Sequence, residues 1–363
     1  MAWQETRDSL SKWRKKLADA PWQLNPDFQH SMSIYFAKQP QVMVSLAEYG
    51  QQLPKIIELA SENDQRMNLP TLEQFDADGS RCDKVHHHPS YLQLGQMIYG
   101  SGMMQMLLQP GRLLESLSHF YLSAHAGEAG HHCPLACTAG VIRVLNTVED
   151  FPEKEDYLKK LTQLNFADNY TGAQFVTEIQ GGSDVGQNAC RAIFTETGEY
   201  QIVGEKWFCS NADAELILMT ARFDQTQSGT KGLGLFLVPK TLADGRHNNY
   251  QICRLKEKLG TRSMASGEII FNGAHAVLMG EQQQSFKLLM EQVLHTSRIY
   301  NSFACLGLSS QAWMISYYYS QYRQAFGQPI FNYPLIQENL CMQRCENAAM
   351  MAFISGQKRA IGS

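Results

Sequence analysis

The spacing of apolar residues divides the chain into three stretches, and the first has a helical period. From about residue 8 to residue 161 strand patterns are rare, and apolar side chains recur at helical spacing over 42–61 and 91–107. Prolines are frequent in this stretch, where they can begin or end helices. The pattern predicts an all-α N-terminal domain over residues 1–168.

The second stretch, residues 169–280, has the pattern of β-strands. Strands are expected at 172–177, 190–195, 200–203, 215–222, 232–239, 250–255 and 267–271. Asn, Gly and Asp gather between these segments as turn formers, and no helix separates consecutive strands as parallel βαβ units require. The pattern predicts a central antiparallel β domain.

Beyond residue 280 the helical period returns. Apolar residues at Phe286, Leu289 and Val293 precede a segment rich in small residues, and tyrosines gather at 317–322. Residues 281–363 are therefore expected to form a C-terminal helical bundle. The expected fold class is a multidomain α and β protein.

Composition and charge indicate which class of protein the chain belongs to and in which compartment it is expected. A chain of 363 residues, 44% hydrophobic and 18% charged, is typical of an ordered globular protein with two or three domains at roughly 150 residues each. The net charge of −4 gives no general attraction to nucleic acid or acidic membranes. Nine cysteines without a repeating spacing, and no apolar signal core or membrane-length apolar run, favour a cytoplasmic protein with reduced thiols and no membrane insertion.

Two groups of histidines and cysteines raise the question of a metal site. They are the histidines at 86–88 and the run His131, His132, Cys133 and Cys137. Their spacing fits none of the paired zinc templates. Helix-entry histidines and small buried thiols are the favoured interpretation, and no metal site is expected.

Two common enzyme motifs are incomplete. Gly232-x-Gly234 does not continue into GxGxxG and leads into a strand rather than a helix, which disfavours a nicotinamide dinucleotide site. Ser183 stands in GGSDV rather than GxSxG, which disfavours a serine hydrolase.

The richest chemistry lies between residues 175 and 211. Thr177 ends an apolar run, and Gly181 and Gly182 then permit a tight turn against which a planar or phosphorylated ligand could lie. Later in this segment, Phe208 and Ser210 place an aromatic ring beside a hydroxyl, as a bound ring system requires. Taken singly, each of these residues is explained as well by core packing or by a turn.

The order of the motifs carries a family resemblance. Thr-Glu-x-x-Gly-Gly-Ser-Asp at 177–184 and Gly-x-Lys-x-Phe-x-Ser-Asn at 204–211 resemble the paired flavin-binding signature of the acyl-CoA dehydrogenase family. With Lys-Leu-Gly-Thr-Arg-Ser at 258–263, they look most like the alkylation-response branch of that family. The ordered motifs cover about half of the chain. The resemblance implies an acyl-CoA dehydrogenase-like oxidoreductase with FAD as its cofactor.

The resemblance also implies roles for single residues. The threonine matching Thr177 touches the pyrimidine edge of the flavin, and the hydroxyl matching Ser210 hydrogen-bonds near N5. The aromatic residue matching Phe208 walls the flavin ring, and the serine matching Ser183 lies by the pyrophosphate and the acyl-CoA. The implied cofactor-binding set comprises Thr177, Gly182, Ser183, Phe208, Cys209, Ser210, Arg323 and Phe326.

Two arginines extend the implied sites. Arg298 matches an arginine beside the CoA part of the substrate, although His295 replaces the acid commonly found nearby. Arg323 and Phe326 match an RxxFG motif whose arginine reaches the FAD pyrophosphate of a neighbouring subunit, which implies a homo-oligomer, a dimer or tetramer. A solvent-facing helix arginine is the alternative for Arg323. An active enzyme would also need an electron acceptor.

The catalytic base has no candidate. In most members of the family a glutamate in an EGT- or EGS-like turn removes the α-proton, and the chain ends before such a motif; another branch places glutamate where Ser297 stands here. The chain is thus expected to be C-terminally shortened, with an incomplete bundle and little dehydrogenation of acyl-CoA. The alternatives are a flavoprotein of the DNA alkylation-damage response and a scaffold that has lost its cofactor.

Overall fold

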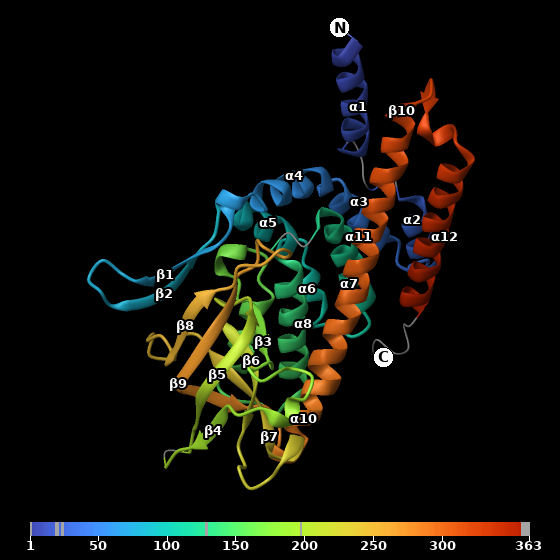
Figure 1. Ribbon diagram of the computed structural model, residues 1–363. Helices are drawn as coiled ribbons and strands as arrows, with labels where there is room; N and C mark the ends of the chain where they lie inside the picture. The colour runs from blue at the N-terminus through green and yellow to red at the C-terminus, as the bar shows by residue number, and fades with distance from the viewer. Residues whose placement is uncertain (1, 19–21, 23–24, 128–129, 197, 357–363) are drawn as a thin grey trace. The chain divides into compact units, whose positions relative to one another are not determined.

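The computed structural model describes residues 2–18, 22, 25–127, 130–196 and 198–356. Its contacts divide the chain into two compact units. The helical unit contains Met1–Ser61, Gln109–Gly127 and Asn301–Ser363, and the sheet unit contains Glu62–Leu108 and Glu128–Tyr300. The expected sequence of N-terminal helices, central sheet and C-terminal helices is confirmed (Figure 1). The boundaries at residues 168 and 280 stay a prediction.

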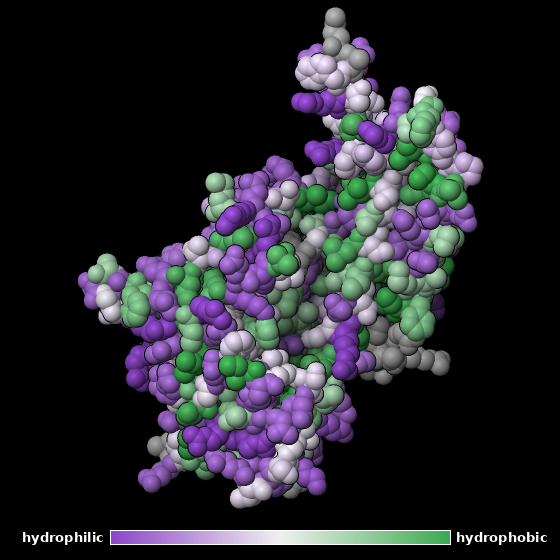
Figure 2. Space-filling model, in the orientation of Figure 1, coloured by the Kyte–Doolittle hydropathy of each residue, from purple (hydrophilic) through white to green (hydrophobic). Residues whose placement is uncertain are grey.

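The helical unit is built almost entirely from helices. Its elements are α1 (Ala2–Ala18), α2 (Pro26–Tyr35), α3 (Pro40–Gly50), α4 (Leu53–Asn63, whose last two residues belong to the sheet unit), α7 (Leu113–Ser123), most of α11 (His295–Tyr322), the hairpin of β10 (Gln324–Ala325) and β11 (Gln328–Pro329), and α12 (Pro334–Gly356). Proline stands in the first turn of α2 and α3, where its missing N–H has no helical partner to lose. Apolar side chains stay exposed along α12, among them Leu335, Met342 and Phe353 (Figure 2).

The sheet unit places its helices around a β domain. Its helices are α5 (Pro89–Tyr99), α6 (Met103–Met106), α8 (His132–Thr147), α9 (Lys154–Leu161) and α10 (Gln282–Leu288), followed by a π-helical turn (Leu289–Leu294) and the start of α11. Its strands are β1 (Thr71–Phe75), β2 (Arg81–His86), β3 (Gly172–Phe175), β4 (Arg191–Phe194), β5 (Tyr200–Ser210), β6 (Leu216–Arg222), β7 (Leu233–Pro239), β8 (Tyr250–Leu255) and β9 (Ser266–Leu278).

Seven strands, β3 to β9, pair into one sheet. The order is β3-β6-β4-β5-β9-β7, with β8 on β9 and a further pairing of β6 with β7. The pairings β6–β4–β5–β9–β7–β6 therefore form a closed ring around a core that includes Phe175, Phe236 and Phe271. The pairs are antiparallel except for β3 with β6 and a single parallel contact of β4 with β6.

The β1–β2 hairpin is an addition to the helical N-terminal region expected from the sequence. It projects beside β8 (Figure 1), and Leu72 and Val85 pack against the core of the sheet. Its turn contains Gly79 at φ 78°, a backbone conformation that favours glycine. The Asp78-Gly79 pair is the sequence signal that could have revealed the hairpin.

Candidate functional site

The loop after β3 forms a tight turn with little room for side chains. Glu178 and Gly181 exchange backbone hydrogen bonds, with N–O distances of 3.0 and 3.2 Å, and Gly181 has φ 141°. A Cβ atom on Gly182 would lie 2.5 Å from Thr177 Oγ1. The missing side chains therefore let the loop fold onto Thr177 and leave backbone exposed at the turn, as close approach of a ligand requires.

Strand β5 carries a bulge where the second half of the signature lies. The register with β9 shifts between Lys206 and Cys209, and Phe208 has φ 54°. The extra residue moves the inward position from Lys206 to Cys209, which is fully buried, and leaves Phe208 50% exposed. Ser210, beyond the bulge, is partly exposed and lies opposite Ser266.

A backbone hydrogen bond joins the two halves of the signature. Trp207 N donates to Thr177 O at 2.9 Å, so Thr177 and Phe208 belong to neighbouring segments. The side chain of Cys209 lies in the core, and only its backbone is available to a ligand. Ser183 is exposed in the loop beyond Gly182.

A buried ion pair underlies both segments. Lys206 Nζ, with its side chain 0% exposed, donates to Glu178 Oε1 at 2.7 Å, to Thr220 Oγ1 at 3.1 Å and to Val176 O at 3.2 Å. All three ammonium protons are thereby matched by acceptors. The Thr220 hydroxyl donates in turn to Asn188 Oδ1 at 2.8 Å, so the network extends to the far end of the loop.

The carboxylate of Glu178 is equally well satisfied. It accepts from Ala189 N at 2.6 Å, from Cys190 N at 3.2 Å and from Gln180 Nε2 at 2.8 Å, besides Lys206. Burial acts to raise the pKa of Glu178, but the charge of Lys206 and these donors outweigh it, and the net pKa is lowered. No role was expected for this pair from the sequence. The position of Lys206 on the inward face of a strand could have revealed the pair, because a buried lysine requires an acidic partner.

A serine near the start of α11 contacts the same β domain. Ser297 Oγ donates to Gln174 Oε1 at 3.0 Å, and Gln174 Nε2 donates to the carbonyl oxygen of Cys137 at 3.2 Å. Arg298 and His295 are both exposed.

A π-helical turn, Leu289–Leu294, comes directly before α11. A regular helix would place Glu291 about 120° from Ser297. The wider turn intervenes, so Glu291 lies at another angle from Ser297 than a regular helix would give. Glu291 is exposed and lies 3.6 Å from Lys287.

The two residues of the RxxFG motif lie in the helical unit. Arg323 and Phe326 belong to the β10–β11 hairpin region, where Phe326 is 98% exposed at φ 52°. Arg323 lines a groove of about 450 Å³ with Tyr322, Gln324 and residues of α1. The structure thus brings Thr177, Gly182, Phe208 and Ser210 into one region, and Arg323 and Phe326 into another.

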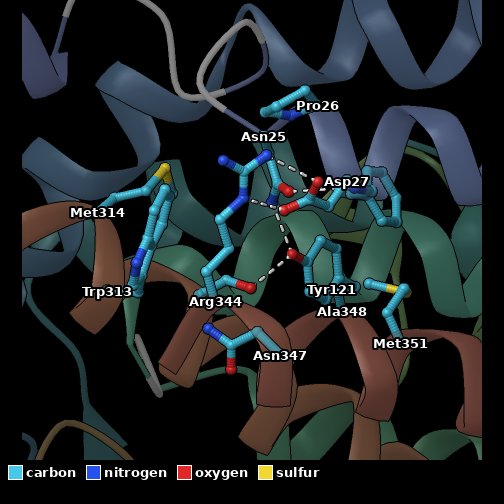
Figure 3. Close-up of a pocket in the computed structure, with 12 residues that line it drawn as sticks. Asn25, Pro26, Asp27, Tyr121, Trp313, Met314, Arg344, Asn347, Ala348 and Met351 are labelled. Atoms are coloured by element: carbon cyan, nitrogen blue, oxygen red, sulfur yellow. Dashed lines mark hydrogen bonds and ion pairs between the residues drawn. The ribbon is translucent and has the colours of Figure 1, made fainter. Parts of the chain in front are cut away.

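The helical unit has a polar cluster of its own, which surrounds a very small cavity (Figure 3). Asn25 Nδ2 donates to Tyr121 Oη at 2.6 Å, and Tyr121 Oη donates to Ser310 Oγ at 2.9 Å. Arg344 and Asp27 form a bidentate pair at its mouth, with N–O distances of 2.8 and 3.0 Å. The cavity volume of about 20 Å³ admits a single water molecule and no organic ligand.

The histidines considered as zinc ligands have other partners. His86 lies 2.6 Å from Glu73, His87 lies 3.0 Å from Asp213, and His131 lies 2.9 Å from the carbonyl oxygen of Tyr91. Burial lowers the pKa of His131 to about 3, so its imidazole is neutral. Over the part of the chain that the structure describes, no group of three or more His, Cys, Asp or Glu side chains could hold a metal ion.

Two family models match adjoining parts of the chain. The model of the adaptive response protein AidB N-terminal domain matches residues 14–168, and that of the acyl-CoA dehydrogenase middle domain matches residues 173–274. The chain belongs to the acyl-CoA dehydrogenase family. The middle-domain match contains the whole bulged signature, and the family is one of flavin-dependent oxidoreductases.

Individual relatives support the AidB-like branch of the acyl-CoA dehydrogenase family. The putative acyl-CoA dehydrogenase AidB of Escherichia coli is 30% identical over 329 residues, 87% of this chain and 59% of AidB. Acyl-CoA dehydrogenase family member 11 of Caenorhabditis elegans is 28% identical over 335 residues, 88% of this chain and 54% of that protein. The chain therefore spans less than two thirds of either relative.

A solved structure of the same family has a closely similar fold. The crystal structure of Caenorhabditis elegans ACDH-11 in complex with C11-CoA matches with a TM-score of 0.86 and 25% identity, covering 93% of this chain and 59% of that one. None of the helices within the described residues is long and apolar enough to span a membrane.

Proposed function

We propose that this chain is an FAD-binding oxidoreductase of the acyl-CoA dehydrogenase type. The observation that carries the proposal is the hydrogen bond from Trp207 N to Thr177 O. It joins the glycine turn to the β5 bulge, so that a backbone cradle, an exposed aromatic ring and two hydroxyls serve one ligand. The buried Lys206–Glu178 pair supports both segments from beneath.

The available groups fit a flavin. Phe208 presents a half-exposed ring for stacking, and the missing Cβ of Gly182 leaves backbone open to a pyrophosphate. Bound FAD would supply the hydride acceptor. The Ser210 hydroxyl would donate a hydrogen bond near N5 and Thr177 would donate at the pyrimidine edge, where negative charge develops.

The cofactor assignment is tested by releasing the chromophore from the purified protein with denaturant and separating it by chromatography. FAD is the expected product, because Arg323 matches a residue that contacts the pyrophosphate, a group that FMN lacks. Recovery of FMN alone would refute the proposal. The same preparation, passed through a light-scattering detector, tests for the homodimer or homotetramer that an Arg323 contact across subunits requires.

The substrate class we propose is acyl-CoA, bound near Ser183 and Arg298, with low turnover in this chain. Dehydrogenation needs a base that takes the α-proton while hydride leaves the β-carbon. Ser297 stands at one family position for that base, but its hydroxyl donates to the amide of Gln174, which cannot take up a proton.

Anaerobic mixing with short, branched and long acyl-CoAs tests this expectation through bleaching of the flavin absorbance. Little bleaching is expected over the time in which dithionite reduces the flavin completely. Rapid stoichiometric bleaching would show that a base is present, and the variants His295→Ala and Glu291→Gln would then identify it. A physiological electron acceptor would be needed only in that case.

A second candidate function is a flavoprotein of the DNA alkylation-damage response without significant dehydrogenase turnover. The match to the AidB N-terminal domain over residues 14–168 favours it. The net charge of −4 supplies no general affinity for DNA, so a cofactor-dependent protective role that needs no strong DNA binding fits better. Survival of alkylated cells with the wild-type chain and with Phe208→Ala distinguishes the two functions, since only the second predicts a difference.

A further inference from the structure

The KLGTRS motif at 258–263 has no task in the proposed function, although it borders the candidate cofactor site. With its neighbours it lines a pocket of about 490 Å³ in the sheet unit. Four cationic side chains and one acidic side chain line that pocket: Arg66, Lys256, Lys258, Arg262 and Glu257. Arg262 is paired with Asp64 at 2.8 Å, which leaves an excess of positive charge from the two lysines and Arg66.

Lys256 makes the decisive contact. Its ammonium nitrogen lies 3.6 Å from the centroid of the Phe208 ring. Trp207 meets the same ring at its edge, with the centroids 6.1 Å apart and the planes at 79°. Phe208 is nevertheless half-exposed. One face of the ring is therefore covered by a cation, while half of the side chain remains exposed and available for stacking.

The backbone fixes Lys256 relative to the rest of the candidate site. Lys256 N donates to the carbonyl oxygen of Ser266 at 2.7 Å, and Lys258 Nζ donates to the hydroxyl of Ser266 at 2.7 Å. Ser266 pairs directly with Ser210 across β5 and β9. Both lysines are thus held by the residue opposite the proposed N5 contact.

We propose that Lys256 is a positioning residue of the cofactor site: it fixes Phe208 as the flavin wall and, with Lys258, provides positive charge that favours the anionic reduced flavin. This inference rests on the proposed FAD site. The contact also accounts for the unusual backbone of Phe208. At φ 54° a bulky residue is strained, and a cation on one ring face helps to hold it there.

The test uses sulfite, an anion whose sulfur forms a bond to flavin N5 and whose adduct carries negative charge on the ring. Lys256→Gln should weaken sulfite binding to the FAD-loaded protein roughly two- to fivefold, the factor expected for an exposed cation–π contact. The reduction potential should fall by about 10 to 20 mV, the same factor converted for a two-electron couple. Lys256→Arg keeps the charge and should restore both values.

Lys159→Gln is the matched control, because Lys159 is an exposed lysine of the same unit on α9. It should leave the sulfite constant, the potential and the unfolding midpoint at wild-type values. Equal sulfite constants in Lys256→Gln and Lys159→Gln would overturn the inference alone. A wild-type chain that takes up no FAD would overturn the proposed function, and the inference with it.

Discussion

The two units of the molecule each bury a polar network, and the networks differ in charge. In the sheet unit the network is ionic, with Lys206 and Glu178 at its centre. In the helical unit it is neutral and runs from His125 through Asn25 and Tyr121 to Ser310. The ionic network lies under a strained, exposed bulge, whereas the neutral one closes a helical core. The difference indicates that charge is buried where the loop and the bulge of the proposed cofactor site have to be fixed.

Removing the lysine of the ionic network should have the largest effect. Lys206→Met leaves Glu178 buried with an unpaired charge, and we expect a loss of about 3–5 kcal/mol in the free energy of unfolding. Urea denaturation measures it. The double variant Lys206→Met with Glu178→Gln removes both charges and should recover most of the stability. A small loss in the single variant would show that water reaches the pair.

The neutral network should give the helical unit its own dependence on pH. Burial lowers the pKa of His125 to about 4. Between about pH 6.5 and pH 4, His125 is therefore protonated in the unfolded chain and neutral in the folded chain. Stability should fall by about 3 kcal/mol as the pH drops from 6.5 to 4 and then level off. Denaturation of His125→Gln, which keeps an acceptor for Asn25, should lack this component. The exposed His30→Gln should retain it.

The ionic network should respond at lower pH. The lowered pKa of Glu178 means that its contribution is fully present above the unfolded value of about 4.3 and is lost as the pH falls through the folded value. The difference in stability between wild type and Glu178→Gln should therefore stay constant above about pH 5 and shrink only below about pH 4 to 5. A difference that already shrinks near pH 6 would assign the transition to another group.

The bulge itself is probed by a neighbouring pair of substitutions. Ser210→Val should weaken the flavin complex by roughly 1–3 kcal/mol, because an acceptor on the flavin loses its donor. Cys209→Val changes a buried side chain of similar size and should leave the flavin spectrum and affinity nearly unchanged. Fluorescence titration with FAD compares the two. Identical affinities would contradict the placement of Ser210 at the cofactor.

The surface ion pair beside the neutral network should matter least. Arg344 and Asp27 are 49% and 39% exposed, and solvent screening limits such a pair to about 1 kcal/mol or less. A double-mutant cycle with Arg344→Gln and Asp27→Asn measures the coupling by urea denaturation. A coupling of several kcal/mol would place this pair with the buried networks instead.

Local patterns were sufficient to predict most elements of the sheet unit. The strand expected at 250–255 is β8, and that expected at 215–222 differs from β6 by one residue. Alternation does not encode strand direction, so the parallel pairing of β3 with β6 was not foreseen. The π-helical turn before α11 was also missed, because its apolar spacing resembles that of an ordinary helix.

Within the candidate site, residue types were easier to predict than their supports. The motif order singled out Thr177, Phe208 and Ser210, whose placement at a cofactor stays a prediction. The burial of Lys206 depends on the register of β5 with β9 and on the bulge, which are set by long-range pairing. The contact of Lys256 with Phe208 joins segments 48 positions apart in the sequence, and no local pattern reveals it.

The β1–β2 hairpin has a consequence for solubility. Among the strands that the structure describes, β8 pairs with β9 alone, which leaves its other edge as a template for a strand of another molecule. Side chains of the hairpin occupy that edge: Gln74 donates to the carbonyl oxygens of Ile252 and Cys253, and Asp83 accepts from Ile252 N. The hairpin therefore covers the free edge of β8 and protects it from edge-to-edge aggregation. Removal of the hairpin would expose β8 as a strand able to nucleate fibres.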